Sequence, residues 1–599
     1  MNFLIPQAQN MGAPIGALVG GGSGGSSPSY SYYVDSVSGS DSNDGTSQAS
    51  ALASLATTVA ALSADDSVAF LRGSSWEEEW DTGILGKVDV TTIGSGSMPV
   101  IDGASVISSW TAEGTANVYE ATVDHNATGN ERLTVYAPDG SLMTRVDNVS
   151  ACSSTPGSFV GLRASDSDPW VVQIHAVDST DPSGKGYAVS HRRRCIFADD
   201  NSVIQGPFKL QRNASNGGPL HLANGVTAKQ ILSVNGTKHN VVVGSGLLED
   251  VVACRADVTT SYEVSSTWFV GYDIDATGLD LTLRRCAVVP DGFDSGGSAL
   301  IMHDSTGNPY DTFVGEQLWG IDCGIWTPTA LDVSINGFYG EVNSSNLTAS
   351  FGAYLDAGTF RYIQMNHAAS GAGQAFGHTF YGASSNTATR TITFQDMVFY
   401  SLNSNTRLLR LWSALNGATL VFRNCVFYMD GFRSIMDEVG GAWNTGALTV
   451  ENCIFAYPSN GNPVRVPTGI TYTGNNNVFL DGSVGATSLN CRFNGTLYST
   501  LAAWQSATGQ DANSLHLNRN QVSELFSGTV ADGDFTLGST GAGAAAAGIS
   551  AGPQFHWDWN ARAPAAGPPT AWPDVPKTLA ECEDYINDPE GYDFYPQAA

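Results

Sequence analysis

The stretch from 392 to 456 contains one nine-residue phrase three times, and this repeat decides the fold. The copies are ITFQDMVFY (392–400), LVFRNCVFY (420–428) and LTVENCIFA (448–456), and each starts 28 residues after the one before it. A weaker copy, YTGNNNVFL, begins at 472. A fixed period of this length indicates a chain built from stacked structural repeats.

The apolar residues change parity in the middle of each phrase. In the first copy, Ile392 and Phe394 alternate with polar residues as in a strand with one buried face. The next apolar residues are Met397 and Phe399, so the chain must bend at Asp396 to keep both halves facing one core. Asp and Asn tolerate the left-handed conformation that such a corner needs.

A strand, a short corner and a second strand, returning every 28 residues, predict like strands stacked in parallel about 4.8 Å apart. The phrases are rich in Val, Ile, Phe and Thr, which favours strands over helices. We therefore expect phenylalanines stacked inside and a ladder of Asp and Asn side chains at one corner. The expected stack is Phe399, Phe427 and Phe455, and the expected ladder is Asp396, Asn424 and Asn452.

This pattern resembles the right-handed parallel β-helix of the pectate-lyase-like superfamily, in which an asparagine ladder marks one corner. Both ends of the chain extend the resemblance. The opening, with a helix expected over 52–62, a strand over 67–71 and TTIGSGSMPVIDGA (91–104), resembles the N-terminal cap and first coil of bacterial and phage β-helix proteins. The segments LAAWQSATGQDANSL (501–515) and HWDWNAR (556–562) resemble the way members of the superfamily end. The resemblance implies an all-β solenoid of about a dozen coils, as in phage tailspike and virion spike proteins.

Composition and spacing divide the chain into six parts. Between the cap and the regular coils, segments such as ERLTVYAPDGSLMTRV indicate antiparallel strands around a turn at Pro138, and hence an inserted β subdomain. The expected parts are an N-terminal attachment segment with a Gly/Ser linker (1–29), cap and first coil (30–105), insert (106–197), coils (198–495), C-terminal capping region (496–562) and acidic tail (563–599).

The net charge of −30 argues against nucleic acid or an anionic membrane as the main partner. No apolar run is long enough to cross a bilayer, and the first basic residue is Arg72, so the N-terminus lacks the charged start of a secretory signal. The nine cysteines are expected to be buried, reduced thiols, although Cys425 and Cys453 would be stacked neighbours. No metal-binding Cys/His spacing and no phosphate loop occur, so no cofactor is predicted.

Polar chemistry is densest between 290 and 326, where the regular phrase fails. Paired carboxylates about 5 Å or roughly 6.5 to 9.5 Å apart can hydrolyse glycosides, and aromatic faces can stack on sugar rings. The competing interpretation is that the acids are turn residues and the tryptophans belong to the core. The candidate catalytic residues are Asp291, Asp294, Asp304, Glu316 and Asp322, and the candidate glycan-binding residues are Tyr310, Trp319 and Trp326.

The catalytic motifs of the resembled enzymes are not found. The calcium-binding Asp and catalytic Arg or Lys of pectate lyases have no matching positions, and the NTD, DD and GHG signatures of polygalacturonases are absent. Gly377-His378-Thr379 lacks the second glycine of the last. The basic run 191–194 could bind an acidic sugar, but pairing with local carboxylates is favoured in so acidic a chain.

Three functions compete. The favoured one is a virion-attached spike, on a phage tail or head, that binds host surface polysaccharide (capsule or lipopolysaccharide) and is expected to be a homotrimer; depolymerisation by hydrolysis or elimination is left open. The alternatives are a soluble extracellular bacterial polysaccharide lyase or glycoside hydrolase and a purely adhesive, non-catalytic spike. Attachment to virion proteins is expected through the apolar residues of the N-terminus, namely Phe3, Leu4, Ile5, Ile15, Leu18 and Val19.

Overall fold

A computed structural model provides the structure of the chain. It describes residues 29–83, 85–124, 133–162, 168–214, 218–236, 239–256, 267–272, 279–291, 298–303, 310–322, 325–327, 330–342, 350–355, 357–367, 376–382, 390–402, 407–411, 417–429, 436–438, 443–456, 463–480, 489–517, 521–549, 551–559 and 561–591. The expected attachment residues lie outside these ranges.

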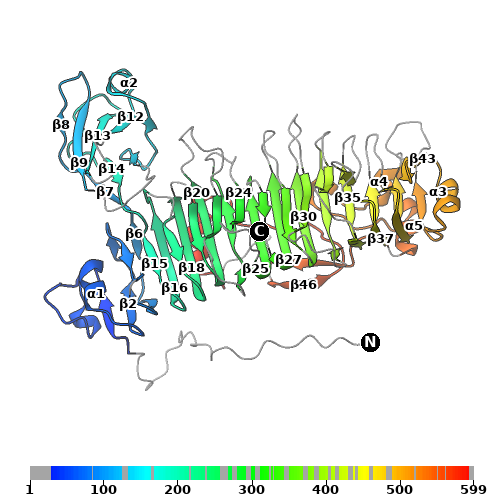
Figure 1. Cartoon of the computed structure of the whole chain (residues 1–599), viewed down its shortest axis with the longest axis horizontal. Helices are drawn as coiled ribbons and strands as arrows, with labels where there is room; N and C mark the ends of the chain where they lie inside the picture. Colours follow the sequence, from blue (N-terminus) through cyan, green and yellow to red (C-terminus); the bar gives the residue numbers. More distant parts are fainter. Residues whose placement is uncertain are drawn as a thin grey trace.

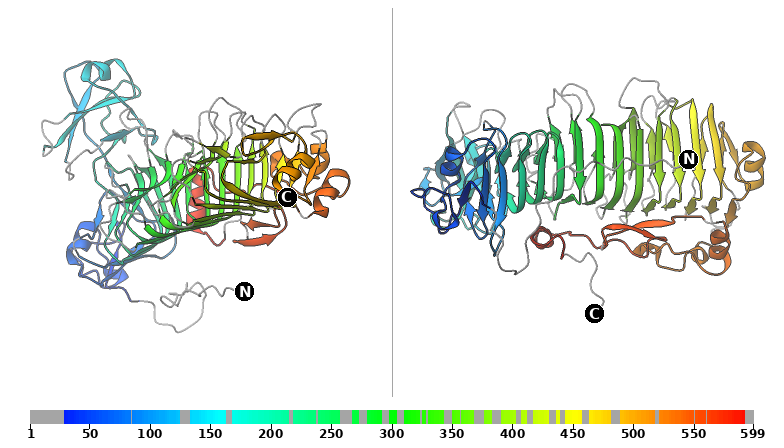
Figure 2. Two further views of the ribbon diagram at one scale, coloured as in Figure 1. Left: turned by 45° about the vertical axis from the view of Figure 1, so that its right-hand side comes forward. Right: turned by 90° about the horizontal axis from the view of Figure 1, so that it is seen from below.

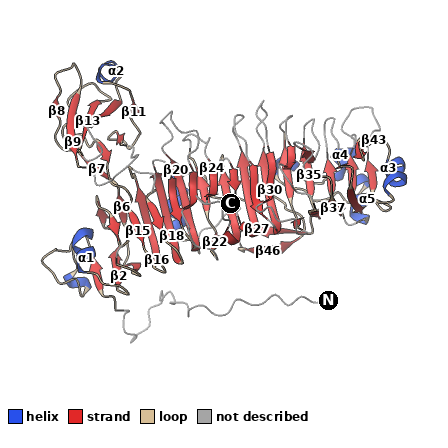
Figure 3. Cartoon of the chain, in the orientation of Figure 1, coloured by secondary structure: helices blue, strands red, loops and turns tan. Residues whose placement is uncertain are grey.

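Two long sheets of parallel strands form the body of the molecule (Figure 1), and strands dominate throughout, as Figure 3 shows. Among the described residues, the main sheet has 22 strands and the second sheet has 11. The chain alternates between them, because β17 (Leu220–Leu222) and β19 (His239–Val243) belong to the second sheet while β18 (Val226–Gly236) and β20 (Gly246–Ala256) belong to the main one. The chain is therefore all-β with a long parallel sheet, as the sequence predicts.

The remaining strands of the main sheet are β1 (Tyr32–Val34), β2 (Ser67–Leu71), β3 (Ser75–Trp76), β5 (Asp89–Ile93), β6 (Val100–Asp102), β16 (Val203–Gln211), β22 (Asp280–Arg284), β23 (Ala287–Val289), β25 (Tyr310–Ile321), β27 (Ala330–Val342), β29 (Ala357–His367), β31 (Thr391–Gln395), β32 (Val398–Ser401), β34 (Thr419–Arg423), β35 (Val426–Met429), β37 (Gly446–Glu451), β38 (Ile454–Ala456), β40 (Ile470–Asn475), β41 (Val478–Leu480) and β44 (Leu515–Leu517). Those of the second sheet are β4 (Trp80–Asp81), β15 (Ile196–Ala198), β21 (Thr267–Tyr272), β24 (Ser298–His303), β26 (Ile325–Thr327), β28 (Ser350–Leu355), β30 (Phe376–Gly382), β33 (Arg407–Leu411) and β36 (Met436–Glu438).

Each repeat of the chain contributes one level of the body. Within the main sheet, the predicted corner divides each level into a first and a second strand half. Asp396, Asn424 and Asn452 have φ of 55°, 54° and 60°, in the left-handed region. Asn424 Nδ2 donates to Asp396 Oδ1 at 3.0 Å, and Asn452 Nδ2 donates to Asn424 Oδ1 at 2.7 Å. The ladder is confirmed, and so is its register, because Leu420 pairs with Leu448, which pairs with Tyr472.

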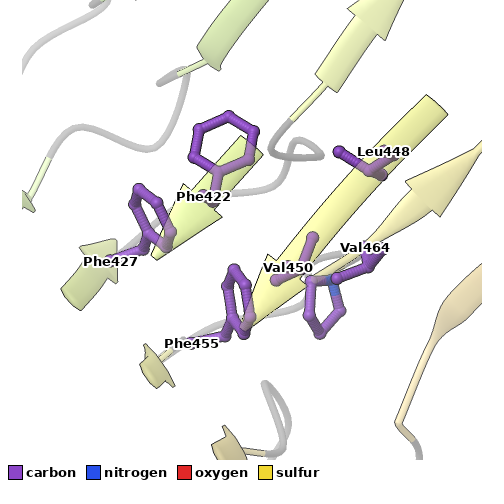
Figure 4. A pocket seen from close by; sticks show the side chains of 7 residues that line it. Phe422, Phe427, Leu448, Val450, Phe455 and Val464 are labelled. Carbon is purple, nitrogen blue, oxygen red and sulfur yellow. The ribbon is translucent and has the colours of Figure 1, made fainter. Parts of the chain in front are cut away.

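The predicted aromatic stack fills the space between the sheets. Phe399, Phe427 and Phe455 are all buried in one hydrophobic cluster. The rings of Phe427 and Phe455 lie 5.2 Å apart and nearly parallel, and Figure 4 shows them beside Phe422 and Val450. Burying one such ring stabilises the fold by about 1.5 to 3 kcal/mol, so a column of rings stabilises the whole stack.

Both open ends of the body are capped. Helix α1 (Leu55–Ala61) lies at the N-terminal end, where the Ser54 side chain accepts a hydrogen bond from Thr57 N. Helix α3 (Leu501–Thr508) lies at the other end, beside the short strands β39 (Arg465–Val466), β42 (Cys491–Phe493) and β43 (Thr496–Tyr498). Its Trp504 donates through Nε1 to the buried carboxylate of Asp511 at 2.8 Å. These caps cover core that the last levels would otherwise expose.

The predicted insert is a separate lobe with its own hydrophobic cluster. It projects beside the first levels of the body in Figure 1. Its strands run from Ala104 to Ser190, slightly earlier than the expected 106–197. Its elements are β7 (Ala104–Val106), β8 (Thr111–Ala112), β9 (Tyr119–Val123), β10 (Thr134–Tyr136), β11 (Thr144–Arg145), α2 (Val149–Ser154), β12 (Ser158–Leu162), β13 (Trp170–His175) and β14 (Ala188–Ser190).

A long C-terminal segment, which we call the strap (521–591), runs back along the body. Figure 2 shows it in orange to red along one side of the strands. It covers the outward side of the second strand halves, which is apolar at positions such as Val398, Val426 and Trp319. Its elements are α4 (Val522–Leu525), α5 (Gly541–Gly548), β45 (Phe555–Asp558), β46 (Ala563–Ala566) and α6 (Leu579–Asn587).

Polar contacts fasten the strap along the body. Near its middle, Gly552 N donates to Asn452 O at 2.8 Å, and near its end Arg72 donates to Asn587 Oδ1 at 2.6 Å. The expected acidic tail from 563 is thus ordered structure as far as residue 591. None of the helices in the described ranges has the length and apolar character needed to cross a bilayer.

Candidate functional site

The first strand halves of the main sheet present a polar surface that is partly exposed among the described residues, and we call it the polar face. Side chains alternate along a strand, so every second residue of these halves points away from the core. Parallel pairing then aligns them in rows that run along the molecule. One row carries mainly hydroxyls, and its members are Thr227, Leu247, Thr282, Val314, Ser334, Thr359, Thr393, Val421, Thr449 and Thr473.

The neighbouring row carries charges and amides. In order along the body it contains Lys229, Glu249, Arg284, Glu316, Asn336, Arg361, Gln395, Arg423, Glu451 and Asn475. Because like strands lie about 4.8 Å apart, each side chain can reach the next one in the row. We call this row the charged row.

Carboxylates of the charged row are held by their cationic neighbours. Glu249 accepts from Lys229 at 2.7 Å, and Glu316 accepts from Arg284 Nε at 2.5 Å. Burial alone would raise the pKa of Glu249, but the Lys229 ammonium and the charges of Arg285 and Arg284 lower it to about 2. Glu249 is therefore an anion at neutral pH and unsuited to donating a proton.

The middle of the charged row differs, because Arg361 stands between two amides, Asn336 and Gln395. Its side chain is exposed, and no carboxylate of a described residue lies within ion-pair distance of it. Its guanidinium does act at longer range on Asp396. Burial raises the pKa of Asp396, and the charge of Arg361 helps to lower it. Arg423, two strands further on, is half exposed and pairs with Glu451 at 2.9 Å.

The predicted catalytic carboxylates do not form a free pair in the described residues. Asp291 accepts from Arg255 Nε at 2.8 Å and from Leu579 N at 3.2 Å, so it is a structural contact between the sheet and the strap. Glu316 is bound to Arg284, as described above. Asp322 follows β25 with a φ of 44°, which is the corner role that Asp commonly has. Asp294 and Asp304 lie outside the described residues.

Two of the predicted glycan-binding aromatics are packing residues instead. Tyr310 is buried and donates through its hydroxyl to Gly244 O at 2.6 Å. Trp319 is fully buried and packs edge-on against Tyr585 of the strap, with ring centroids 5.4 Å apart. A sugar cannot reach either ring, so the expected stacking role is corrected for both. Strand β26 contains Trp326, whose side chain lies outside the described part.

The sequence patterns did not single out Arg361 and Arg423, because the acidic residues are densest elsewhere, between 290 and 326. A signal was present: Arg423 stands at the fourth place of its phrase, directly before the corner, and such a place faces outward. Among the described residues, no group of three or more His, Cys, Asp or Glu side chains could hold a metal ion.

Comparisons with known proteins identify no family. No family model matches the chain, and no curated protein matches it. Among solved structures, the complex of XylC with xylose has a TM-score of 0.39 at 10% identity, over 82% of this chain and 86% of that one. A glycoside hydrolase gives 0.32 at 7% identity, over 82% and 96%. The GH136 lacto-N-biosidase from Eubacterium ramulus gives 0.25 at 10%, over 75% and 63%. Likeness at this level carries no argument about function.

Proposed function

We propose that this protein is a virion-attached spike, built on a right-handed parallel β-helix, that binds host cell-surface polysaccharide along its polar face. The observation that carries the proposal is the contrast between the two outward surfaces of the main sheet. One is apolar and covered by the strap, while the other is polar, and nearly all side chains of its hydroxyl and charged rows are partly or fully exposed among the described residues.

The spacing of the polar face suits an extended glycan. Strand spacing of about 4.8 Å is close to the advance of one sugar ring along an extended chain, so successive sugars meet successive strands. Threonine hydroxyls and amides both donate and accept hydrogen bonds, as sugar hydroxyls do. Arg361 and Arg423 add two cations to the face of a chain whose net charge is −30, and they favour a glycan that carries carboxylates or phosphates.

Binding is tested with capsular polysaccharide and lipopolysaccharide preparations and the full-length protein. The variants Arg361→Ala and Arg423→Ala each remove one exposed guanidinium, and a charge-assisted hydrogen bond contributes about 1.5 to 3 kcal/mol. We expect binding to weaken about 10- to 100-fold per variant, and less at high salt. Arg145→Ala, on the insert lobe, is the matched control. Unchanged affinity in both polar-face variants would remove the polar face as the binding surface.

Cleavage is a separate question with a separate measurement. A spike that also depolymerises the glycan releases new reducing ends or unsaturated sugars from the same preparations, whereas an adhesive spike releases none. Because Asp291 is held by Arg255 and by the strap, away from the polar face, we expect Asp291→Asn to leave any such release unchanged. Activity in a soluble form that joins no particle would favour the alternative of a bacterial polysaccharide lyase or hydrolase.

A further inference from the structure

Helix α6, the last element of the strap, lies across the outward side of β20. Two anchors fix its direction. At its first turn Leu579 N donates to Asp291, which Arg255 at the end of β20 also holds. At its last turn the Tyr585 hydroxyl donates to Asp250 Oδ1, near the corner within β20, at 2.5 Å. The middle of the helix therefore lies over the residues between 250 and 255.

Two cysteines meet in this interface. Cys582 is on the buried side of α6, between the two anchors, and Cys254 is on the outward side of β20. Both are fully buried free thiols in the same hydrophobic cluster, and the two thiols interact directly. They come from segments 328 positions apart in the sequence.

We propose that Cys254 and Cys582 form a disulfide that fastens the strap to the main sheet when the protein meets an oxidising medium. With oxidised glutathione, one cysteine thiolate attacks the disulfide and releases one glutathione thiolate. The second cysteine then attacks the mixed disulfide and releases the other glutathione. Two electrons and two protons pass from the cysteine pair to the two glutathiones, and one S–S bond replaces another.

The surroundings also set when this reaction occurs. Burial raises the pKa of Cys582 well above its ordinary range, and contact with Cys254 raises it further, so the packed thiol is protonated and unreactive. Oxidation therefore begins when α6 lifts from β20, and re-docking of the helix then brings the second thiol onto the mixed disulfide. The cross-link closes a very long loop, which is where a disulfide restricts the unfolded chain most.

A second cysteine pair in the same molecule serves as an internal control. Cys425 and Cys453 follow neighbouring corners, and both are fully buried between the two sheets. Opening the strap does not expose this pair, and strand stacking rarely gives the torsion angle that a disulfide needs. The same oxidant should leave both thiols free.

The experiment treats the full-length protein with oxidised glutathione, blocks free thiols, and maps tryptic peptides without reductant. Cleavage after Lys and Arg gives peptide 239–255, which holds Cys254, and peptide 578–599, which holds Cys582. We expect these two peptides as one cross-linked species that lacks two hydrogen atoms. It should persist in Cys425→Ser and be absent in Cys582→Ser. In Tyr585→Phe, which loosens α6 but keeps the ring, we expect it about tenfold faster.

Two results would overturn the proposal. One is free or separately glutathionylated Cys254 and Cys582, without the cross-linked species, in both the wild-type protein and Tyr585→Phe. The other is a cross-link of either cysteine to a different residue in the intact protein. A second readout accompanies the peptide map. After cleavage at Lys577, peptide 578–599 should stay covalently attached to the oxidised protein until a reductant is added.

Discussion

At the residue scale, the corner positions decide how the chain turns. The corner between the two strand halves holds a left-handed residue on every level from Gln230 to Asn476, and several of these have polar side chains that bond to the level above or below. Arg285, for example, donates through Nε to Asp250 Oδ1 at 2.7 Å. A residue there needs both tolerance of positive φ and a side chain of the right length, which explains why Asp and Asn recur.

Asn424 allows these two requirements to be measured separately. Asn424→Ala leaves a residue that has a Cβ atom but no polar side-chain group at a φ of 54°. It also removes two ladder hydrogen bonds. We expect a loss of about 3 kcal/mol in unfolding free energy. Asn424→Gly keeps the backbone relaxed, so it should lose only about 1 to 2 kcal/mol. Denaturant midpoints measure both, and equal losses would show that positive φ carries no cost here.

At the element scale, the base of the insert lobe joins two oppositely charged segments. Glu79 lies between β3 and β4, and its carboxylate is 3.8 Å from Arg194 Nε, at the end of the basic run 191–194. This contact agrees with the expected pairing with local carboxylates for Arg194. Burial raises the pKa of Glu79 from 4.5 to about 7, although Arg194 opposes the shift.

This shift predicts a pH dependence with a definite sign. The folded protein keeps a proton on Glu79 that the unfolded chain has released, so stability falls as pH rises from 4.5 towards about 7. Glu79→Gln does not titrate. We expect the melting temperature of the wild type, relative to this variant, to decrease across that window and to be constant above about pH 8. A constant difference throughout would mean that Glu79 ionises normally.

The strap is the second element whose role can be tested alone. Without residues 551–599 the outward side of the second strand halves, including Trp319 and Val252, would face water. Exposed apolar patches of this kind promote association. We expect the truncated protein to bind a hydrophobic dye and to aggregate, whereas removal of 592–599 alone should change neither property. A soluble truncated protein that binds no dye would contradict this role.

At the scale of the whole molecule, a virion-attached spike needs an attachment point and a way to raise its avidity for glycan. The apolar residues of 1–29 belong to a segment too short to form a core of its own. Burial of five or six of them in an interface would offset the entropic cost of ordering so short a segment. Side-by-side assembly into a homotrimer would place three polar faces on one glycan-coated surface.

Deleting residues 1–29 tests the attachment. We expect a folded, soluble protein that no longer joins its particle, measured by circular dichroism and by incorporation into assembled virions. Incorporation at the wild-type level would refute the assignment. Light scattering of the intact chain at micromolar concentration tests the homotrimer, and a monomer mass would exclude it.

The sequence by itself determined the repeating part of this protein. The period of 28 residues, the corner at Asn424 and the inward side of Phe427 follow from local patterns, because in a stacked fold each strand pairs with its own neighbouring copy. The outward apolar residues Val426 and Ile454 also held a signal that was not used, since a solvated strand face would be polar there.

Only the tertiary structure decided what covers that surface and which acidic side chains are paired with arginines. The strap meets the sheet through contacts such as Tyr585 with Asp250, which no periodicity links. Asp291 meets Arg255 across levels where the phrase is irregular, so its pairing could not be assigned from spacing. Repeats fix contacts between equivalent positions, whereas contacts with a non-repeating segment depend on the path that the chain takes back along the body.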